Sequence, residues 1–182
     1  GIGQIGGKQV AANGKSQVLS RPPPPPEEFS RALRVGIEIT TEVMRISAPS
    51  ATAKVRVMQL LNQTITAERV IVLNAPSGFV EADLDQDLLK VAMFDRHGRG
   101  NQVVFGFLNG FGAKVGAVGL TANLDENTLM VAGSDDGDMA LCANVLLQAG
   151  GGVAVVDNGA VLEKVELPVG GICSLRPWRE IG

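Results

Sequence analysis

The stretch SDDGDMALCANVLLQAG, residues 134–150, carries the strongest helix signal in this chain of 182 residues. Ser134 or Asp135 can cap the first turn, because a side-chain oxygen at that position accepts a hydrogen bond from a free backbone N–H group. Gly150 is suited to end the helix. The apolar residues of one face recur at helical spacing: Met139, Cys142, Val145, Leu146 and Ala149. The stretch therefore predicts an amphipathic helix that packs one face on a sheet.

The segment GVAVVDNGAVLEKVEL follows this helix and predicts a β-hairpin, because Asn158 and Gly159 tolerate the positive φ angles of a tight turn. Short, mostly apolar segments between turn residues predict further strands at 54–61, 68–74, 102–108, 116–122 and 128–133. Residues 83–97 fit either a helix or a strand in their second half. Helices and strands do not alternate strictly. We therefore expect an α+β domain, a mixed, largely antiparallel sheet with helices packed on it.

The first part of the chain differs from the rest in composition. Residues 5–19 predict two short strands about an Asn13-Gly14 turn, and five prolines at 22–26 then form an extended spacer. A lone hairpin is marginally stable in water, so we expect this one to belong to another sheet. The predicted organisation is a β-hairpin remnant of an upstream small β domain (1–21), a proline spacer (22–26) and a main domain (27–182).

Composition disfavours several partners. A formal net charge of −3 and an aromatic content of 4% offer neither a basic surface nor stacking platforms, so we expect no nucleic acid. No apolar run approaches the roughly 18 residues of a membrane-spanning helix, so we expect no membrane. Cys142 and Cys173 show no CxxC spacing, which favours a reducing, cytoplasmic setting.

The loop RHGRGN, residues 96–101, contains the only histidine of the sequence. A metal ligand needs two or three companions, and no second histidine exists, so we expect no metal site. His97 is compatible with a general base paired with Asp95 or Asp125. It is also compatible with a partly buried histidine that is hydrogen-bonded in a turn.

A second polar run, NLDEN at 123–127, separates two of the predicted strands. It is compatible with a plain turn or with a ligand-binding loop. Likewise, Arg96 and Arg99 fit either an anion site or solvated loop positions. If strands 102–108 and 116–122 pair as neighbours, both loops meet at one sheet edge, as an ion network or the rim of a pocket. The predicted polar cluster comprises Arg96, His97, Arg99, Asn123, Asp125, Glu126 and Asn127.

Four segments in combination resemble the C-terminal domain of the bacterial adenine deaminases of the amidohydrolase superfamily: RHGRGN, GFLNGFGAKVGAVGLTANLDEN, SDDGDMALCANVLLQAGGGVAVVDNGAVL and LPVGGICS. The resemblance continues upstream through GGKQVAANGK, the proline spacer, RISAPSATAKVRVMQL and TAERVIVL. It covers nearly the whole chain. The family's His-Asp-Ser-His-Asn run reads Asn123-Leu124-Asp125-Glu126-Asn127 here, so both histidines are replaced. The resemblance therefore implies a divergent branch that acts on another substrate or on none.

The resemblance implies that the complete enzymes hydrolyse adenine to hypoxanthine and ammonia with a divalent metal such as Mn, Fe or Zn. Histidines and an aspartate of a (β/α)8 barrel, which precedes this segment, hold that metal. We therefore expect this chain to hold no cofactor and to be inactive by itself, with the upstream barrel as its partner if the chain is a fragment. A homo-oligomer is also compatible with the sequence. The alternative is a stand-alone domain that binds a small ligand or supports oligomerisation without catalysis.

Overall fold

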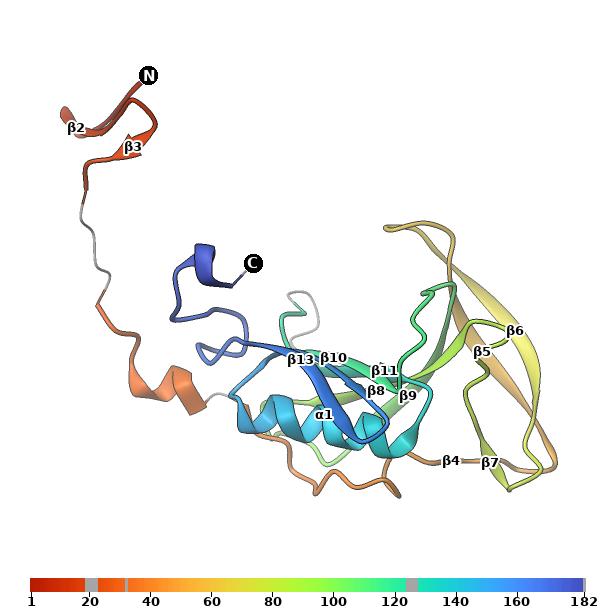
Figure 1. Cartoon of the computed structure of the whole chain (residues 1–182). Helices are drawn as coiled ribbons and strands as arrows, with labels where there is room; N and C mark the ends of the chain where they lie inside the picture. Colours follow the sequence, from red (N-terminus) through yellow and green to blue (C-terminus); the bar gives the residue numbers. More distant parts are fainter. Residues whose placement is uncertain (19–22, 32, 124–127, 182) are drawn as a thin grey trace.

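The computed structural model describes residues 1–18, 23–31, 33–123 and 128–181. Its main sheet has eight strands in the order β13-β12-β10-β11-β8-β9-β5-β6 (Figure 1). Their bounds are β5 Thr52–Leu60, β6 Thr66–Asn74, β8 Leu88–Asp95, β9 Val103–Asn109, β10 Ala117–Leu120, β11 Thr128–Gly133, β12 Gly152–Asp157 and β13 Ala160–Glu166. Neighbouring strands pair antiparallel except β5 and β9, which are parallel. The expected mixed, largely antiparallel sheet is confirmed.

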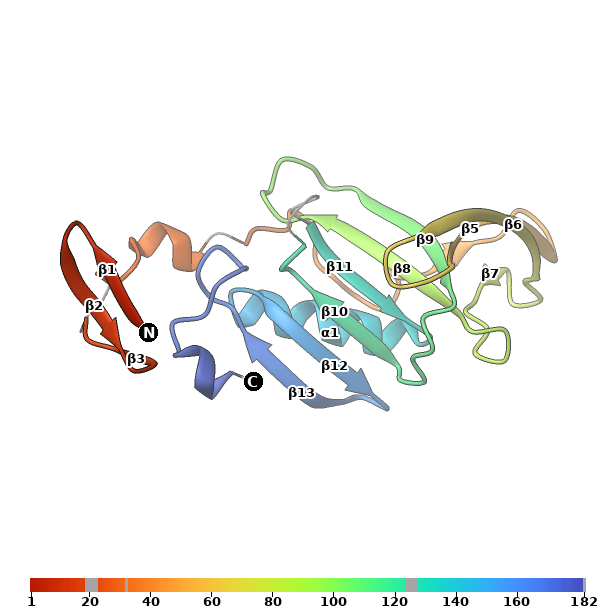
Figure 2. The same cartoon turned by 90° about the horizontal axis from the view of Figure 1, so that it is seen from above.

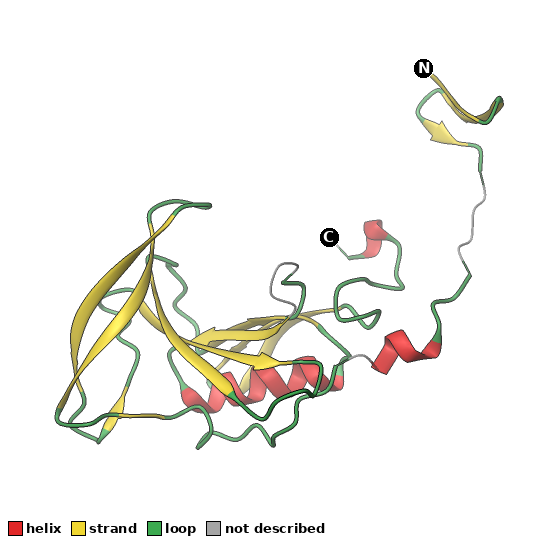
Figure 3. Ribbon diagram, turned by 180° about the vertical axis from the view of Figure 1, so that it is seen from behind, coloured by secondary structure: helices red, strands yellow, loops and turns green. Residues whose placement is uncertain are grey.

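The helix α1 (Asp136–Gln148) packs along one face of this sheet, as Figures 1 and 3 show. Asp135 is the N-cap, and its carboxylate accepts a hydrogen bond from the Asp138 N–H at 2.8 Å. The chain leaves the helix through Gly150 at a φ of 75°, a conformation that glycine adopts without strain. Met139, Cys142 and Leu146 of α1 are buried. The helix and its ends are therefore as the sequence predicts.

The hydrophobic core has two parts. The larger lies between α1 and the sheet, and its buried members include Ala92, Phe94, Leu129, Val131 and Met139. The smaller lies under the β5–β6 hairpin. It is flanked by a two-stranded sheet of β4 (Ile46–Ser47) and β7 (Phe79–Val80). Alternate residues of each strand supply these cores, because side chains in a strand point to opposite faces in turn.

The N-terminal residues form a separate three-stranded sheet of β1 (Ile2–Ile5), β2 (Lys8–Ala12) and β3 (Lys15–Ser16). Asn13 and Gly14 have positive φ angles at the predicted turn, whereas β1 is a strand that the sequence prediction missed. Figures 1 and 2 show this sheet apart from the main one. The short 3-10 helices are η1 (Glu27–Arg31) and η2 (Trp178–Glu180). The proposed domain boundaries stay a prediction.

One predicted strand pairing is wrong. The strands at 102–108 and 116–122 correspond to β9 and β10, and β11 and β8 lie between them. Residues 83–97, which fit either a helix or a strand, form the strand β8 in their second half. Among the described residues, no helix combines the length and the apolar character that crossing a membrane requires.

The N-cap gives a first test of this fold. Replacing Asp135 with Ala leaves the Asp138 N–H without its side-chain acceptor, so we expect the free energy of unfolding to fall by about 1 kcal/mol. Asp135→Asn is the matched control, because its amide oxygen still accepts the bond. Urea unfolding measures both variants. Equal losses in the two variants would contradict the capping role.

Candidate functional site

The turn that follows β8 is organised by the carboxylate of Asp95. Its Oδ1 accepts a hydrogen bond from the backbone N–H of His97 at 2.9 Å, and its Oδ2 accepts one from Arg99 at 2.8 Å. These bonds, the one from His97 first, hold the pKa of Asp95 below its ordinary value. The carboxylate therefore binds the backbone of His97 and not its ring. The interpretation of a partly buried histidine is wrong, since His97 is exposed.

Arg96 points inward from the same turn. Its side chain is 4% exposed, and Nη1 donates a hydrogen bond to the carbonyl oxygen of Thr121 at 3.0 Å. Burial lowers the pKa of the guanidinium. The interpretation as a solvated loop arginine is therefore wrong for Arg96. Arg99 is exposed, and its role as a solvated or an anion-binding arginine stays a prediction.

Thr121 extends this contact to the C-terminal segment. Its hydroxyl donates to the carbonyl oxygen of Gly171 at 2.7 Å and accepts a hydrogen bond from the Gly152 N–H at 2.7 Å. Arg96 and Thr121 thus tie together the ends of β8 and β10, the start of β12 and the loop at Gly171. We call this arrangement the Arg96–Thr121 clamp. The hydrogen bonds of Nη1 of Arg96 and of the Thr121 hydroxyl go to backbone groups, so they hold these parts of the fold together.

The run RHGRGN follows β8 and the run NLDEN precedes β11 in the sequence. β8 and β11 are neighbours in the sheet, whereas the sequence predicted that β9 and β10 are neighbours. β8 and β11 pair antiparallel with Asp95 opposite Thr128, so the last residue of β8 and the first residue of β11 lie at the same end of the sheet. Asn123 donates from Nδ2 to the hydroxyl of Thr128 at 2.9 Å. Asp125, Glu126 and Asn127 lie outside the described residues, so the proposed cluster with Arg96 and Arg99 stays a prediction.

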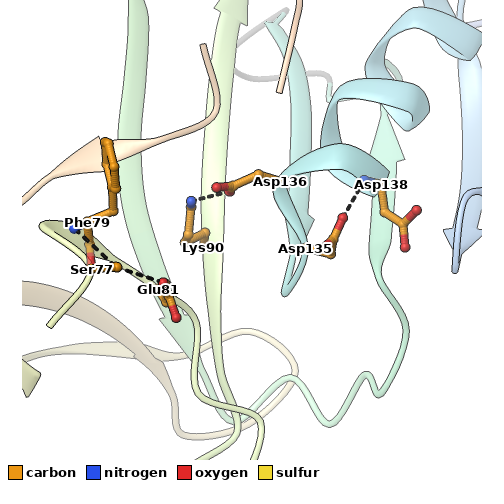
Figure 4. A network of polar contacts seen from close by, with 7 residues as sticks. All are labelled: Ser77, Phe79, Glu81, Lys90, Asp135, Asp136 and Asp138. Atoms are coloured by element: carbon orange, nitrogen blue, oxygen red, sulfur yellow. Dashed lines mark hydrogen bonds and ion pairs between the residues drawn. The ribbon is translucent and has the colours of Figure 1, made fainter. Parts of the chain in front are cut away.

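A polar cavity of about 510 Å³ lies beside the N-terminus of α1, where the sequence analysis placed no site. Figure 4 shows its central ion pair, in which Nζ of Lys90 contacts Oδ1 of Asp136. Lys90 is 2% exposed and Asp136 is 24% exposed. The signal for this pair is a lysine within the otherwise apolar run LLKVAMF of β8, since lysine is almost never fully buried without a partner.

The opposite wall of the cavity comes from the segment around β7. The hydroxyl of Ser77 donates to Oε1 of Glu81 at 2.9 Å (Figure 4). The guanidinium of Arg45 lies 5.3 Å from the ring centroid of Phe79, within the range of a cation–π contact. The cavity therefore combines charges of both signs, and its most buried cation is already paired.

Among the described residues, neither the Arg96–Thr121 clamp nor the polar cavity has the side chains of a metal-dependent hydrolytic centre. In the described part of the chain, no three His, Cys, Asp or Glu side chains are grouped so that they can hold a metal ion. The Cys142 thiol is not a nucleophile either: burial, and then the charge of Asp138, raise its pKa to about 12, so it stays protonated at neutral pH. The described residues thus build the Arg96–Thr121 clamp and a polar cavity, and they form no group of side chains that can hold a metal ion.

Comparison with known proteins identifies the family. Residues 63–182 match the adenine deaminase C-terminal domain. The chain belongs to this family. Its relatives include adenine deaminases from Moorella thermoacetica (34% identical over 97% of this chain and 30% of the relative), Clostridium botulinum strain ATCC 19397 (36% over 86% and 26%) and Carboxydothermus hydrogenoformans (adenine deaminase 1, 37% over 92% and 28%).

These matches confirm the resemblance to the adenine deaminase C-terminal domain. The chain spans less than a third of the length of these curated relatives. The matched residues begin between β5 and β6 and include the Arg96–Thr121 clamp, Lys90 and α1. The matched residues therefore include the clamp and the Lys90–Asp136 pair, whereas Thr41 and Arg45 of the cavity lie before them.

The ion pair of this family domain gives an asymmetric prediction. Asp136→Ala leaves the deeply buried Lys90 without its partner, so we expect a loss of about 3 kcal/mol or more in the free energy of unfolding. Lys90→Met should cost about 1 kcal/mol or less, because Asp136 is partly exposed and can turn to water. The double variant should recover most of the loss. Urea unfolding measures all three, and equal costs for the two single variants would disprove the asymmetry.

The turn at Asp95 gives a prediction on pH. The pKa of Asp95 in the folded state lies below its ordinary value of 3.8. Its stabilising contribution is therefore present above 3.8 and is lost as the pH falls through the folded-state pKa. We expect Asp95→Asn to be less stable than the wild type near pH 7, with the gap closing as the pH falls below 3.8 and through the lowered folded-state pKa of Asp95. Thermal unfolding across this range measures the gap.

His97→Ala is the control for that series. It keeps the backbone N–H that donates to Asp95, so it should leave the pH dependence nearly unchanged. A gap between wild type and Asp95→Asn that stays constant with pH would show that the carboxylate charge has no role in the turn.

Proposed function

We propose that this chain is the C-terminal part of an adenine deaminase-like hydrolase of the amidohydrolase superfamily, acting in the cytoplasm. The parent reaction converts adenine and water into hypoxanthine and ammonia. The observation that carries the proposal is the match of residues 63–182 to the adenine deaminase C-terminal domain. The adenine deaminases from M. thermoacetica and C. hydrogenoformans, similar over 97% and 92% of the chain, support it further.

The divalent metal that the family implies does not fit the residues of this chain. Zinc and similar metals need three or four His, Cys or carboxylate ligands. The sequence has one histidine, His97, and the adjacent carboxylate of Asp95 is bound to backbone N–H groups. We propose that the metal is held by a barrel outside these 182 residues.

Because the metal is held outside these 182 residues, the chain is inactive by itself. Hydrolysis at the amino-bearing carbon of adenine needs an activated water, which a metal or a positioned base must supply. Lys90 is paired with Asp136, and Cys142 stays protonated. Neither Lys90 nor Cys142 is thus available as a general base or a nucleophile.

The test is an assay of ammonia release by the purified chain with adenine and added Mn, Fe or Zn. We expect no turnover above background and no stoichiometric metal after dialysis. The C. hydrogenoformans adenine deaminase 1 serves as the positive control. Turnover that survives repurification and disappears in His97→Ala would overturn the proposal.

The second candidate function is a stand-alone domain that binds a small ligand. The polar cavity beside α1, about 510 Å³ in volume, is the observation that favours it. The DNA upstream of the segment that encodes residue 1 separates the two candidates. A reading frame that continues into a barrel with a His-x-His motif supports the deaminase, whereas a start codon at that point supports the stand-alone domain.

A further inference from the structure

The face of the main sheet opposite α1 is apolar across five strands. One cross-strand row consists of Val153, Leu120, Met130, Met93 and Val104, which face one another in register from β12 to β9. Val104 is 62% exposed and Val153 is 37% exposed, while the three residues between them are half-buried. An antiparallel sheet with one face in water normally carries polar side chains there. This row carries none.

A second row runs beside the first and is apolar too. It consists of Val155, Val118, Ala132, Val91 and Gly106 in the same order of strands. A Cβ atom added at Gly106 would meet no atom within 4 Å, so this glycine leaves open space in the middle of β9. A hollow of about 380 Å³ lies there. Glycine inside a strand often marks a place where another part of a protein approaches closely.

The rim of the hollow comes from the β5–β6 hairpin. Arg56, Met58 and Glu68 line it together with Val104 and Gly106. Met58 is 47% exposed. Figures 1 and 3 show that the hairpin bends away from the side of the sheet that α1 covers, so the open face is concave. Apolar patches of this kind, rimmed by polar residues, mark interaction surfaces.

We propose that this concave face is the docking surface for the catalytic part of the same polypeptide, the part that precedes this domain in an adenine deaminase. The inference rests on the proposed function. About 70% of the M. thermoacetica relative lies outside the matched segment, so the complete polypeptide has a part large enough to cover this face. A second copy fits less well, because two concave faces placed together enclose a void, whereas packed interfaces leave few.

The test fills the hollow without disturbing the fold. Gly106→Leu adds a side chain where nothing stands in its way, at a φ that is not positive. Gly100→Leu is the matched control, since Gly100 also has open space and no positive φ but lies in the loop after β8. Both variants are made in the 182-residue chain and in the full-length polypeptide expressed from the complete gene.

We expect both variants to leave the thermal unfolding midpoint of the 182-residue chain unchanged. In the full-length polypeptide, Gly106→Leu should lower the midpoint of this domain's transition by about 3 °C or more, because overpacking pushes the docked surfaces apart. Gly100→Leu should leave it unchanged there too.

A Gly106→Leu midpoint equal to that of the wild type in both contexts would overturn the docking face while the proposed function stands. A gene that encodes no catalytic part would overturn both. Sedimentation of the 182-residue chain tests whether a second copy of the chain occupies this face. A dimer that Gly106→Leu dissociates would assign the face to a second copy and overturn the proposal.

Discussion

A single helix has to cover a sheet that is much wider than itself. The 13 residues of α1 span about 20 Å, whereas eight strands span roughly 34 Å. The helix packs on β12, β10 and β11, towards the β13 end of the sheet, and the smaller core beside β4 and β7 covers the part under the β5–β6 hairpin. The other face keeps its apolar rows. This unequal covering explains why a domain with two good cores still exposes Val104 and Met58.

Buried polar groups fix how the elements dock. Lys90 and Asp136 join β8 to the first turn of α1, and the Arg96–Thr121 clamp joins three strands to the C-terminal segment. A buried ion pair adds little net stability compared with apolar packing. A buried charge that loses its partner costs much free energy. The Lys90–Asp136 pair therefore favours one packing of α1 on the sheet over shifted packings. In this domain the polar contacts thus position elements that apolar burial holds together.

The sequence predicts local structure well and pairing poorly. The cap at Asp135, the stop at Gly150 and the turn at Asn158-Gly159 depend on neighbouring residues, and the structure has all three. The order of the central strands depends on long-range contacts, so adjacency along the chain wrongly placed β9 beside β10. The sequence could not show that Arg96 of the predicted cluster points inward. Its hydrogen-bond acceptor in the buried position is the carbonyl oxygen of Thr121, which lies 25 residues away in the sequence.

The accessibility of Val104 tests the central claim, that the open face is covered by the catalytic part, most directly. The measurement is the rate at which a thiol reagent labels Val104→Cys in a Cys173→Ser background, where Cys142 is buried. We expect fast labelling in the 182-residue chain and labelling slower by about tenfold or more in the full-length polypeptide, because a docked surface excludes the reagent. Equal rates in the two proteins would contradict it.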